Sequence, residues 1–213
     1  MANRKFLYLN IFFIIVIYMV TLYLSNILVF NEEFYLKSFS DQVPEFSILA
    51  YLDYKSNFDV VNYFMLILSL ILKTVLTSIC ISLGLLMAIG DVSFRKVFKS
   101  VIYSEWVFVL SQIAYLIILV LNSETLVISN VSNYYPLSII SFFGSIEKDL
   151  VWLIYPLKSL NIFEVLFTFS FSFFYSRFTN LNYEKTLGVT FVSYFLWLFL
   201  WLAFTIFLTI LTN

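Results

Sequence analysis

Long apolar runs separated by short polar stretches dominate this sequence. The runs that we expect to cross a membrane cover residues 6–30, 61–89, 101–121, 160–175 and 187–211. A helix needs about 20 apolar residues to cross the roughly 30 Å hydrocarbon core of a bilayer. The run at 61–89 exceeds this length and must tilt or protrude, whereas the run at 160–175 is short. The pattern therefore predicts an all-α fold, a single polytopic transmembrane bundle of five helices.

The first apolar run also has the features of a signal peptide, because the basic residues Arg4 and Lys5 precede it. However, the apolar core of a signal peptide has about 7–15 residues, and small residues mark its cleavage site. Residues 6–30 form a longer run that ends in bulky side chains. We therefore interpret this run as an uncleaved membrane helix.

The two longest stretches between the apolar runs differ in composition. Residues 31–59 mix acidic side chains with aromatic and aliphatic ones, which favours short amphipathic helices at the membrane surface. Residues 123–159 are apolar, but prolines and polar groups divide them into pieces too short to span. This second stretch is expected to be either interfacial or re-entrant.

A Tyr-Pro pair occurs twice in the second stretch, as Tyr135-Pro136 and Tyr155-Pro156. Tyrosine favours the headgroup level of a membrane, and proline favours the first turn of a helix. These four residues are therefore predicted to be interface anchors.

The distribution of basic residues predicts the orientation of the chain. If the N-terminus is inside, the short inner segments hold seven Lys and Arg residues and the much longer outer segments hold four. Positive charges concentrate in cytoplasmic loops. The N-terminus is therefore expected inside and the C-terminus outside, with residues 31–59 and 123–159 as extracytoplasmic loops that carry interfacial helices.

The composition supports a membrane location and restricts the possible partners. Hydrophobic residues make up 62% of the chain and charged residues 12%, whereas soluble domains have about 25% charged residues. The lipid bilayer is therefore the expected solvent of the apolar surface. With a net charge of −1, the chain lacks the basic surface that nucleic-acid binding requires, and no nucleic acid is expected as a partner.

Few residues are suited to catalysis or to metal binding. The chain contains no histidine, which excludes the common zinc motifs and the Ser-His-Asp triad. The single cysteine, Cys80, lies in an apolar run and is expected to be an inert buried thiol. A Ser–Lys dyad of Lys73 with Ser69 or Thr77 is possible from the spacing alone. We predict no catalytic, cofactor-binding or metal site.

The second apolar run carries one charged residue, Lys73, near its middle. A charge at the centre of a bilayer is costly, so this side chain is expected to face the bundle interior and to pair. Glu164 of the fourth run is the predicted partner, with Gln112 of the third run nearby. Glu105 is expected to be farther away, because it follows the predicted start of the third run by one turn. The group is interpreted either as a structural ion pair or as part of a proton or ion pathway.

From Asp91 to Leu208 the chain resembles the Yip family of five-span membrane proteins, and in particular its bacterial branch. Two strings carry the resemblance: SFRKVFKSVIYSEWVF, a basic inner loop that leads into a helix, and PLKSLNIFEVLFTFSFSFFYSRFTNLNYEKTLGVTFVSYFLWL. The resemblance implies a cytosolic N-terminus, a lumenal or periplasmic C-terminus, and a membrane-organising or adaptor role. It also implies a multi-pass protein of the bacterial plasma (inner) membrane.

Three functions are compatible with the sequence. The first is a non-catalytic accessory subunit, scaffold or adaptor that contacts membrane-protein partners through its outer loops. The alternative is a transporter or channel component with an intramembrane polar track around Lys73. The third is a membrane enzyme that acts on lipid substrates, which the scarcity of catalytic groups disfavours.

Overall fold

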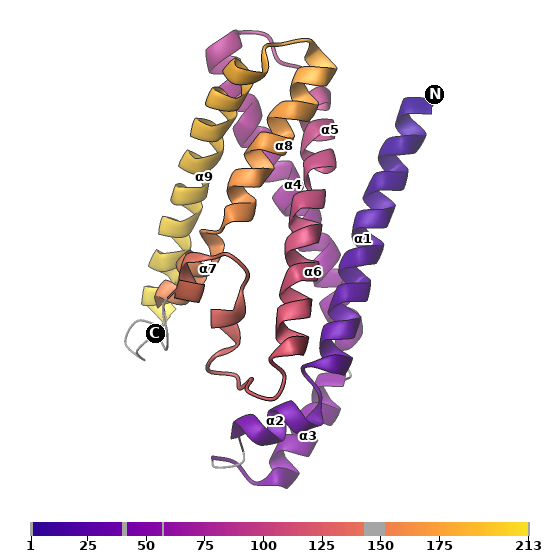
Figure 1. The fold of residues 1–213 in the computed structure, drawn as a ribbon, viewed down its shortest axis with the longest axis vertical. Coiled ribbons are helices and arrows are strands. Elements are labelled where there is room, and N and C mark those ends of the chain that lie inside the picture. The colour runs from indigo at the N-terminus through magenta and orange to yellow at the C-terminus, as the bar shows by residue number, and fades with distance from the viewer. Residues whose placement is uncertain (1, 40–41, 57, 143–151, 213) are drawn as a thin grey trace.

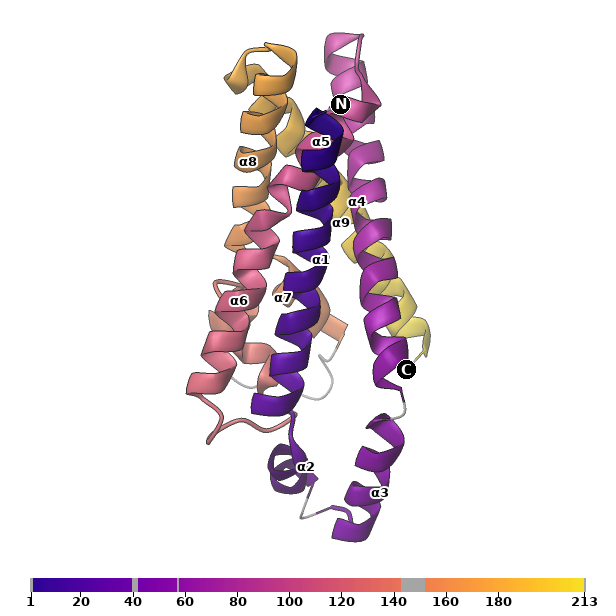
Figure 2. The ribbon, with the colours of Figure 1, turned by 90° about the vertical axis from the view of Figure 1, so that its right-hand side faces the viewer.

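The computed structural model describes residues 2–39, 42–56, 58–142 and 152–212. Long helices run side by side along the longest axis of the molecule (Figures 1 and 2). These long helices are α1 (Ala2–Leu28), α4 (Asp59–Ile89), α5 (Phe94–Ser104), α6 (Trp106–Leu121), α8 (Ile162–Thr179) and α9 (Tyr183–Thr212). Shorter helices are α2 (Glu32–Phe39), α3 (Glu45–Ser56), η1 (Val131–Tyr134), η2 (Ile139–Phe142) and α7 (Ile154–Ser159). Every named element in the described chain is helical, as the sequence predicted.

Four segments of the described chain are long and apolar enough to cross a membrane. They are Lys5–Leu28, Val60–Ile89, Phe94–Leu121 and Tyr183–Leu211. The helix α8 is not among them, because within its 18 residues it carries Glu164, Arg177 and several hydroxyl side chains. The lengths and composition of these helices are thus consistent with the predicted membrane class.

The third long segment begins earlier than residue 101, where the apolar pattern predicted its start. The helix α5 starts at Phe94 and is separated from α6 by a single turn residue, Glu105. One face of α5 buries Val97 and Val101, each 0% exposed. The opposite face carries Arg95 and Lys96, whose charges made this turn look like a loop. Long basic side chains extend toward water while the helix backbone continues below them.

The helix α8 lies against both α5 and α9 (Figure 1). Its residues Phe167, Phe171 and Tyr175 are at most 1% exposed and form the main core cluster with apolar residues of α4 and α5. The hydroxyls of Thr168 and Ser172 on the same face donate to backbone carbonyls of their own helix, at 2.8 and 2.7 Å. Small side chains satisfied in this way allow helices to pack closely in lipid.

The two ends of the bundle carry different segments. The N-terminus, the turn from α4 to α5 and the turn from α8 to α9 lie at one end, and both views agree on this (Figures 1 and 2). Left-handed residues end the helices there: Gly90 after α4 (φ 86°) and Asn180 after α8 (φ 59°). The helices α2 and α3 and the C-terminal end of α9 lie toward the opposite end. The chain ends are therefore on opposite sides of the bundle.

The stretch between α6 and α8 folds back beside the bundle instead of extending away from it (Figure 1). A single antiparallel bridge joins Ser138 to Asn161, with hydrogen bonds of 3.0 and 3.1 Å on either side. This bridge closes the stretch into a loop, of which residues 143–151 lie outside the described residues. Leu126, in the same stretch, is packed with Phe34 of α2 in a second apolar cluster.

Close approach of α4 to α9 depends on the absence of a side chain at Gly84. A Cβ atom built there lies 2.5 Å from Cβ of Ser193 and even nearer to its hydroxyl. By contrast, a Cβ atom at Gly188 of α9 meets nothing within 4 Å. Gly84 is therefore a packing requirement, whereas Gly188 is not.

We expect Gly84→Ala to destabilise the bundle by about 1–3 kcal/mol, because the added methyl group must push two helices apart. Gly188→Ala is the matched control and is expected to be neutral or stabilising, since alanine is the better helix former. Unfolding in mixed detergent micelles measures both. Ser193→Gly combined with Gly84→Ala should recover stability, and equal effects of the two alanine substitutions would contradict the packing.

Candidate functional site

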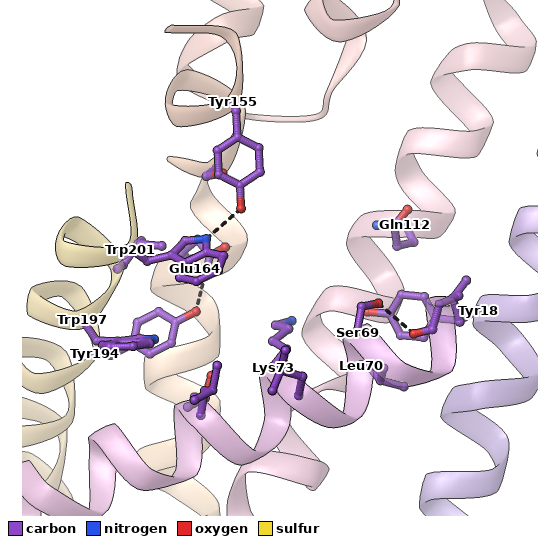
Figure 3. A pocket seen from close by; sticks show the side chains of 16 residues that line it. Tyr18, Ser69, Leu70, Lys73, Gln112, Tyr155, Glu164, Tyr194, Trp197 and Trp201 are labelled. Atoms are coloured by element: carbon purple, nitrogen blue, oxygen red, sulfur yellow. Dashed lines mark hydrogen bonds between the residues drawn. The ribbon is translucent and has the colours of Figure 1, made fainter. Parts of the chain in front are cut away.

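A half-open cavity of about 440 Å³ lies between α4, α6, α8 and α9, and residues of α1 and α7 complete its lining (Figure 3). Its polar lining includes Lys73 of α4, Gln112 of α6 and Glu164 of α8. All three residues of the predicted polar group therefore face one space. The cavity's remaining lining is largely aromatic and aliphatic.

Lys73 does not pair with Glu164, and this part of the prediction was wrong. Its ammonium nitrogen lies 3.2 Å from a carboxylate oxygen of Glu105. It also lies 3.4 Å from the centre of the Phe108 ring, within cation–π range. The Glu105 side chain is 3% exposed and that of Lys73 39% exposed, so the lysine alone reaches into the cavity.

The different partner follows from where the third span begins. The prediction started that span at residue 101 and so placed Glu105 near the inner end. Because the helix begins at Phe94, Glu105 lies near the middle of the Phe94–Leu121 segment, as Lys73 does in α4. Glu105 is also the residue at which α5 gives way to α6. The charged pair and the helix break therefore coincide.

Glu164 lies on the opposite side of the cavity, in the first turn of α8. The side chain of Asn161 caps this helix by accepting from the backbone N–H groups of Phe163 and Glu164, at 2.9 and 3.2 Å. The Tyr194 hydroxyl of α9 donates a hydrogen bond to the Glu164 carboxylate. The cap fixes the start of α8 and thereby the position of this carboxylate.

Aromatic rings connect the two charged sites. Phe108, beside Lys73, lies 5.2 Å from Phe167 between ring centres, and Phe167 lies 4.9 Å from Tyr194. Phe167 and Tyr194 are 1% and 5% exposed. The row of rings packs α6, α8 and α9 together and separates the two carboxylates with an apolar layer.

Three aromatic residues of α9 were missed as cavity residues: Tyr194, Trp197 and Trp201. Their spacing of three and four residues places them on one helical face. Trp201 donates from Nε1 to the Tyr155 hydroxyl, at 3.0 Å. The spacing was a usable signal, but α9 is apolar on all sides, so periodicity alone did not distinguish this face from one that contacts lipid.

The four predicted interface anchors have different surroundings. Tyr155 is 48% exposed at the cavity, whereas Pro136 and Pro156 are buried. Tyr135 is half-buried, with the ammonium of Lys158 lying 4.8 Å from its ring centre. Burial lowers the pKa of Lys158 and raises the pKa of Tyr135. Their depth in a membrane stays a prediction.

A smaller cavity of about 90 Å³ lies on the far side of the ion pair, between α1, α4 and α5. Glu105 and Thr74 are its polar lining residues, and the rest are apolar. Lys73 faces the large cavity and Glu105 the small one, so their ion pair lies between the two spaces.

Within the part of the chain that the structure describes, Lys73 is hydrogen-bonded to neither Ser69 nor Thr77. The Ser69 hydroxyl donates to the backbone carbonyl of Leu66 at 2.8 Å, within its own helix. Both Ser69 and Thr77 line the cavity with Lys73. The Lys73 ammonium instead donates to the Glu105 carboxylate.

Comparisons of the chain with protein-family models, with curated proteins and with solved structures found no match. The cavity and its lining therefore carry the functional argument.

A double-mutant cycle tests which carboxylate is coupled to Lys73. We expect Lys73→Met to destabilise the protein because it leaves Glu105 charged and buried. The coupling free energy between Lys73→Met and Glu105→Gln should reach about 1 kcal/mol. It should exceed the coupling free energy between Lys73→Met and Glu164→Gln. Unfolding in mixed micelles measures all variants. Stronger coupling of Lys73 to Glu164 would contradict the pairing.

Proposed function

We propose that the chain crosses the bacterial inner membrane five times, with α8 as the fourth span in chain order and the N-terminal end of the bundle in the cytoplasm. The 18 residues of α8 correspond to about 27 Å, close to the thickness of the hydrocarbon core. Six basic side chains lie in segments of the N-terminal end, and these favour a cytoplasmic location. They are Lys5, Arg95, Lys96, Lys99, Arg177 and Lys185.

Single cysteines introduced in a Cys80→Ala background test the orientation and the crossing of α4. Glu45→Cys and Asp91→Cys both replace exposed residues, at opposite ends of the bundle. A membrane-impermeant thiol reagent should label Glu45→Cys in intact spheroplasts and Asp91→Cys only after permeabilisation. The reverse pattern would invert the orientation, and labelling of both in intact spheroplasts would contradict the crossing of α4, which separates the two positions.

For the biochemical role, we propose that the protein is a transporter or channel component that admits a small polar solute into the bundle. The observation that carries this proposal is the cavity of about 440 Å³ that reaches Lys73. Small-molecule sites enclose roughly 300–1,000 Å³. Ionisable groups inside a membrane are costly and usually mark a pathway for ions or solutes. Two such groups, Lys73 and Glu164, line this one cavity.

Two helix breaks beside the cavity support the same role. The turn at Glu105 separates α5 from α6, and Leu160 and Asn161 separate α7 from α8. Transporters often build their binding sites from discontinuous helices, because half-helix ends present polar groups within the membrane. Here the start of α8 brings Glu164 to the cavity.

An accessory-subunit role is the second candidate, and the surface of α3 favours it. Phe46 and Tyr54 are 81% and 63% exposed on this helix, which lies beyond the ends of the long helices (Figure 1). Exposed aromatic side chains of this kind are typical of contact surfaces. This candidate requires no water in the cavity, so cavity accessibility separates the two roles.

Neighbouring positions of α4 provide that test in a Cys80→Ala background. Ser69 lines the cavity, whereas Leu68 is 47% exposed and outside the cavity lining. We expect a charged thiol reagent to label Ser69→Cys much faster than Leu68→Cys. A thiol in contact with lipid ionises poorly, and the lipid excludes the charged reagent. Equal, slow labelling of both would contradict a hydrated cavity and leave the accessory role as the better proposal.

A further inference from the structure

The two ionisable groups in the cavity are not equivalent. The Lys73 ammonium is balanced by Glu105 at 3.2 Å and also lies against the Phe108 ring. Glu164 accepts a hydrogen bond from Tyr194, and among the described residues it has no ion pair. The neutral hydroxyl does not cancel the negative charge of an ionised carboxylate. The Lys73 ammonium attracts this carboxylate across the cavity, but it lies beyond ion-pair distance and is paired with Glu105. The Glu164 side of the cavity therefore offers a charge for a cation to neutralise.

Aromatic side chains gather on the same side. Tyr194, Trp197 and Trp201 from α9 and Tyr155 from α7 lie around Glu164, as Figure 3 shows. The bond from Trp201 to Tyr155 ties α9 to α7 across this part of the lining. Aromatic faces attract cations, and tryptophan does so most strongly. A carboxylate among several such rings is the chemistry that recognises alkylammonium groups.

We propose that the Glu164 side of this cavity binds a small organic cation, an alkyl- or arylammonium compound, with its charged nitrogen at Glu164 and among the rings of Tyr155, Trp197 and Trp201. This inference rests on the proposed function and names the substrate class of the same cavity. A metal ion fits less well, because hard cations require six or more oxygen ligands. An anion would meet a lysine whose charge is already balanced.

Equilibrium dialysis of the purified full chain in phosphatidylcholine nanodiscs tests the proposal, with benzyltrimethylammonium as the cation and benzenesulfonate as the anion of similar size. Empty nanodiscs correct for lipid binding. We expect saturable binding of the cation and none of the anion. Glu164→Gln should weaken cation binding at least about tenfold, because the neutral amide loses the charge attraction.

Glu184→Gln is the matched control, because Glu184 is an exposed carboxylate in the first turn of α9, away from the cavity. This variant should bind the cation as the unchanged protein does. Trp201→Leu should weaken binding several-fold while keeping the charge, and it replaces Glu164→Gln if the latter fails to fold. For each variant, an unchanged helix content by circular dichroism and a single peak in size-exclusion chromatography verify that the protein is folded.

Absence of saturable cation binding, binding of the anion at equal or greater strength, or equal cation binding by Glu164→Gln would each overturn the proposal. The labelling of Ser69→Cys separates this failure from that of the proposed function. If the charged thiol reagent reaches Ser69→Cys and the cation does not bind, the cavity role stands without this substrate class. If the reagent does not label Ser69→Cys and the cation does not bind, both proposals fail.

Discussion

The arrangement of the bundle depends on one ion pair whose carboxylate is buried among apolar helices. Lys73 and Glu105 lie near the middle of two long membrane helices and 3.2 Å apart. Neither charge is tolerable alone at this depth, so α4 and α5–α6 must adopt positions that keep them together. The pair also lies between two cavities, and only the larger of these brings further polar groups together.

The large cavity arises from the way α4 crosses the bundle. Gly84 allows α4 to approach α9 closely near one end, and α4 reaches α1 toward the other (Figures 1 and 2). The helix thus leaves α9 along its length, and the space that opens is lined by Lys73, Trp197 and Trp201. A close contact that requires glycine at one position therefore accompanies a cavity farther along the same two helices.

Breaks in two helices determine which polar groups reach that space. Asn161 ends one segment and caps the next, so Glu164 lies in a first turn instead of within a continuous apolar helix. The fold-back of the stretch before it brings Tyr155 to Trp201. Tyr155 comes from a region whose apolar pieces are each too short to span, and this shortness is what makes the region available to line a cavity.

The sequence by itself determined the membrane class, the helical content and the membership of Lys73, Gln112 and Glu164 in one polar group, because apolar length and helical spacing are local properties. It misplaced the start of the third span, because basic residues on an amphipathic turn resemble a loop. Only the tertiary structure decided that Lys73 pairs with Glu105 and that Tyr194, Trp197 and Trp201 face the cavity. Which side chains pair across two helices depends on the relative depth of the helices and on the rotation of each about its axis. The sequence of a helix that is apolar on all sides predicts neither.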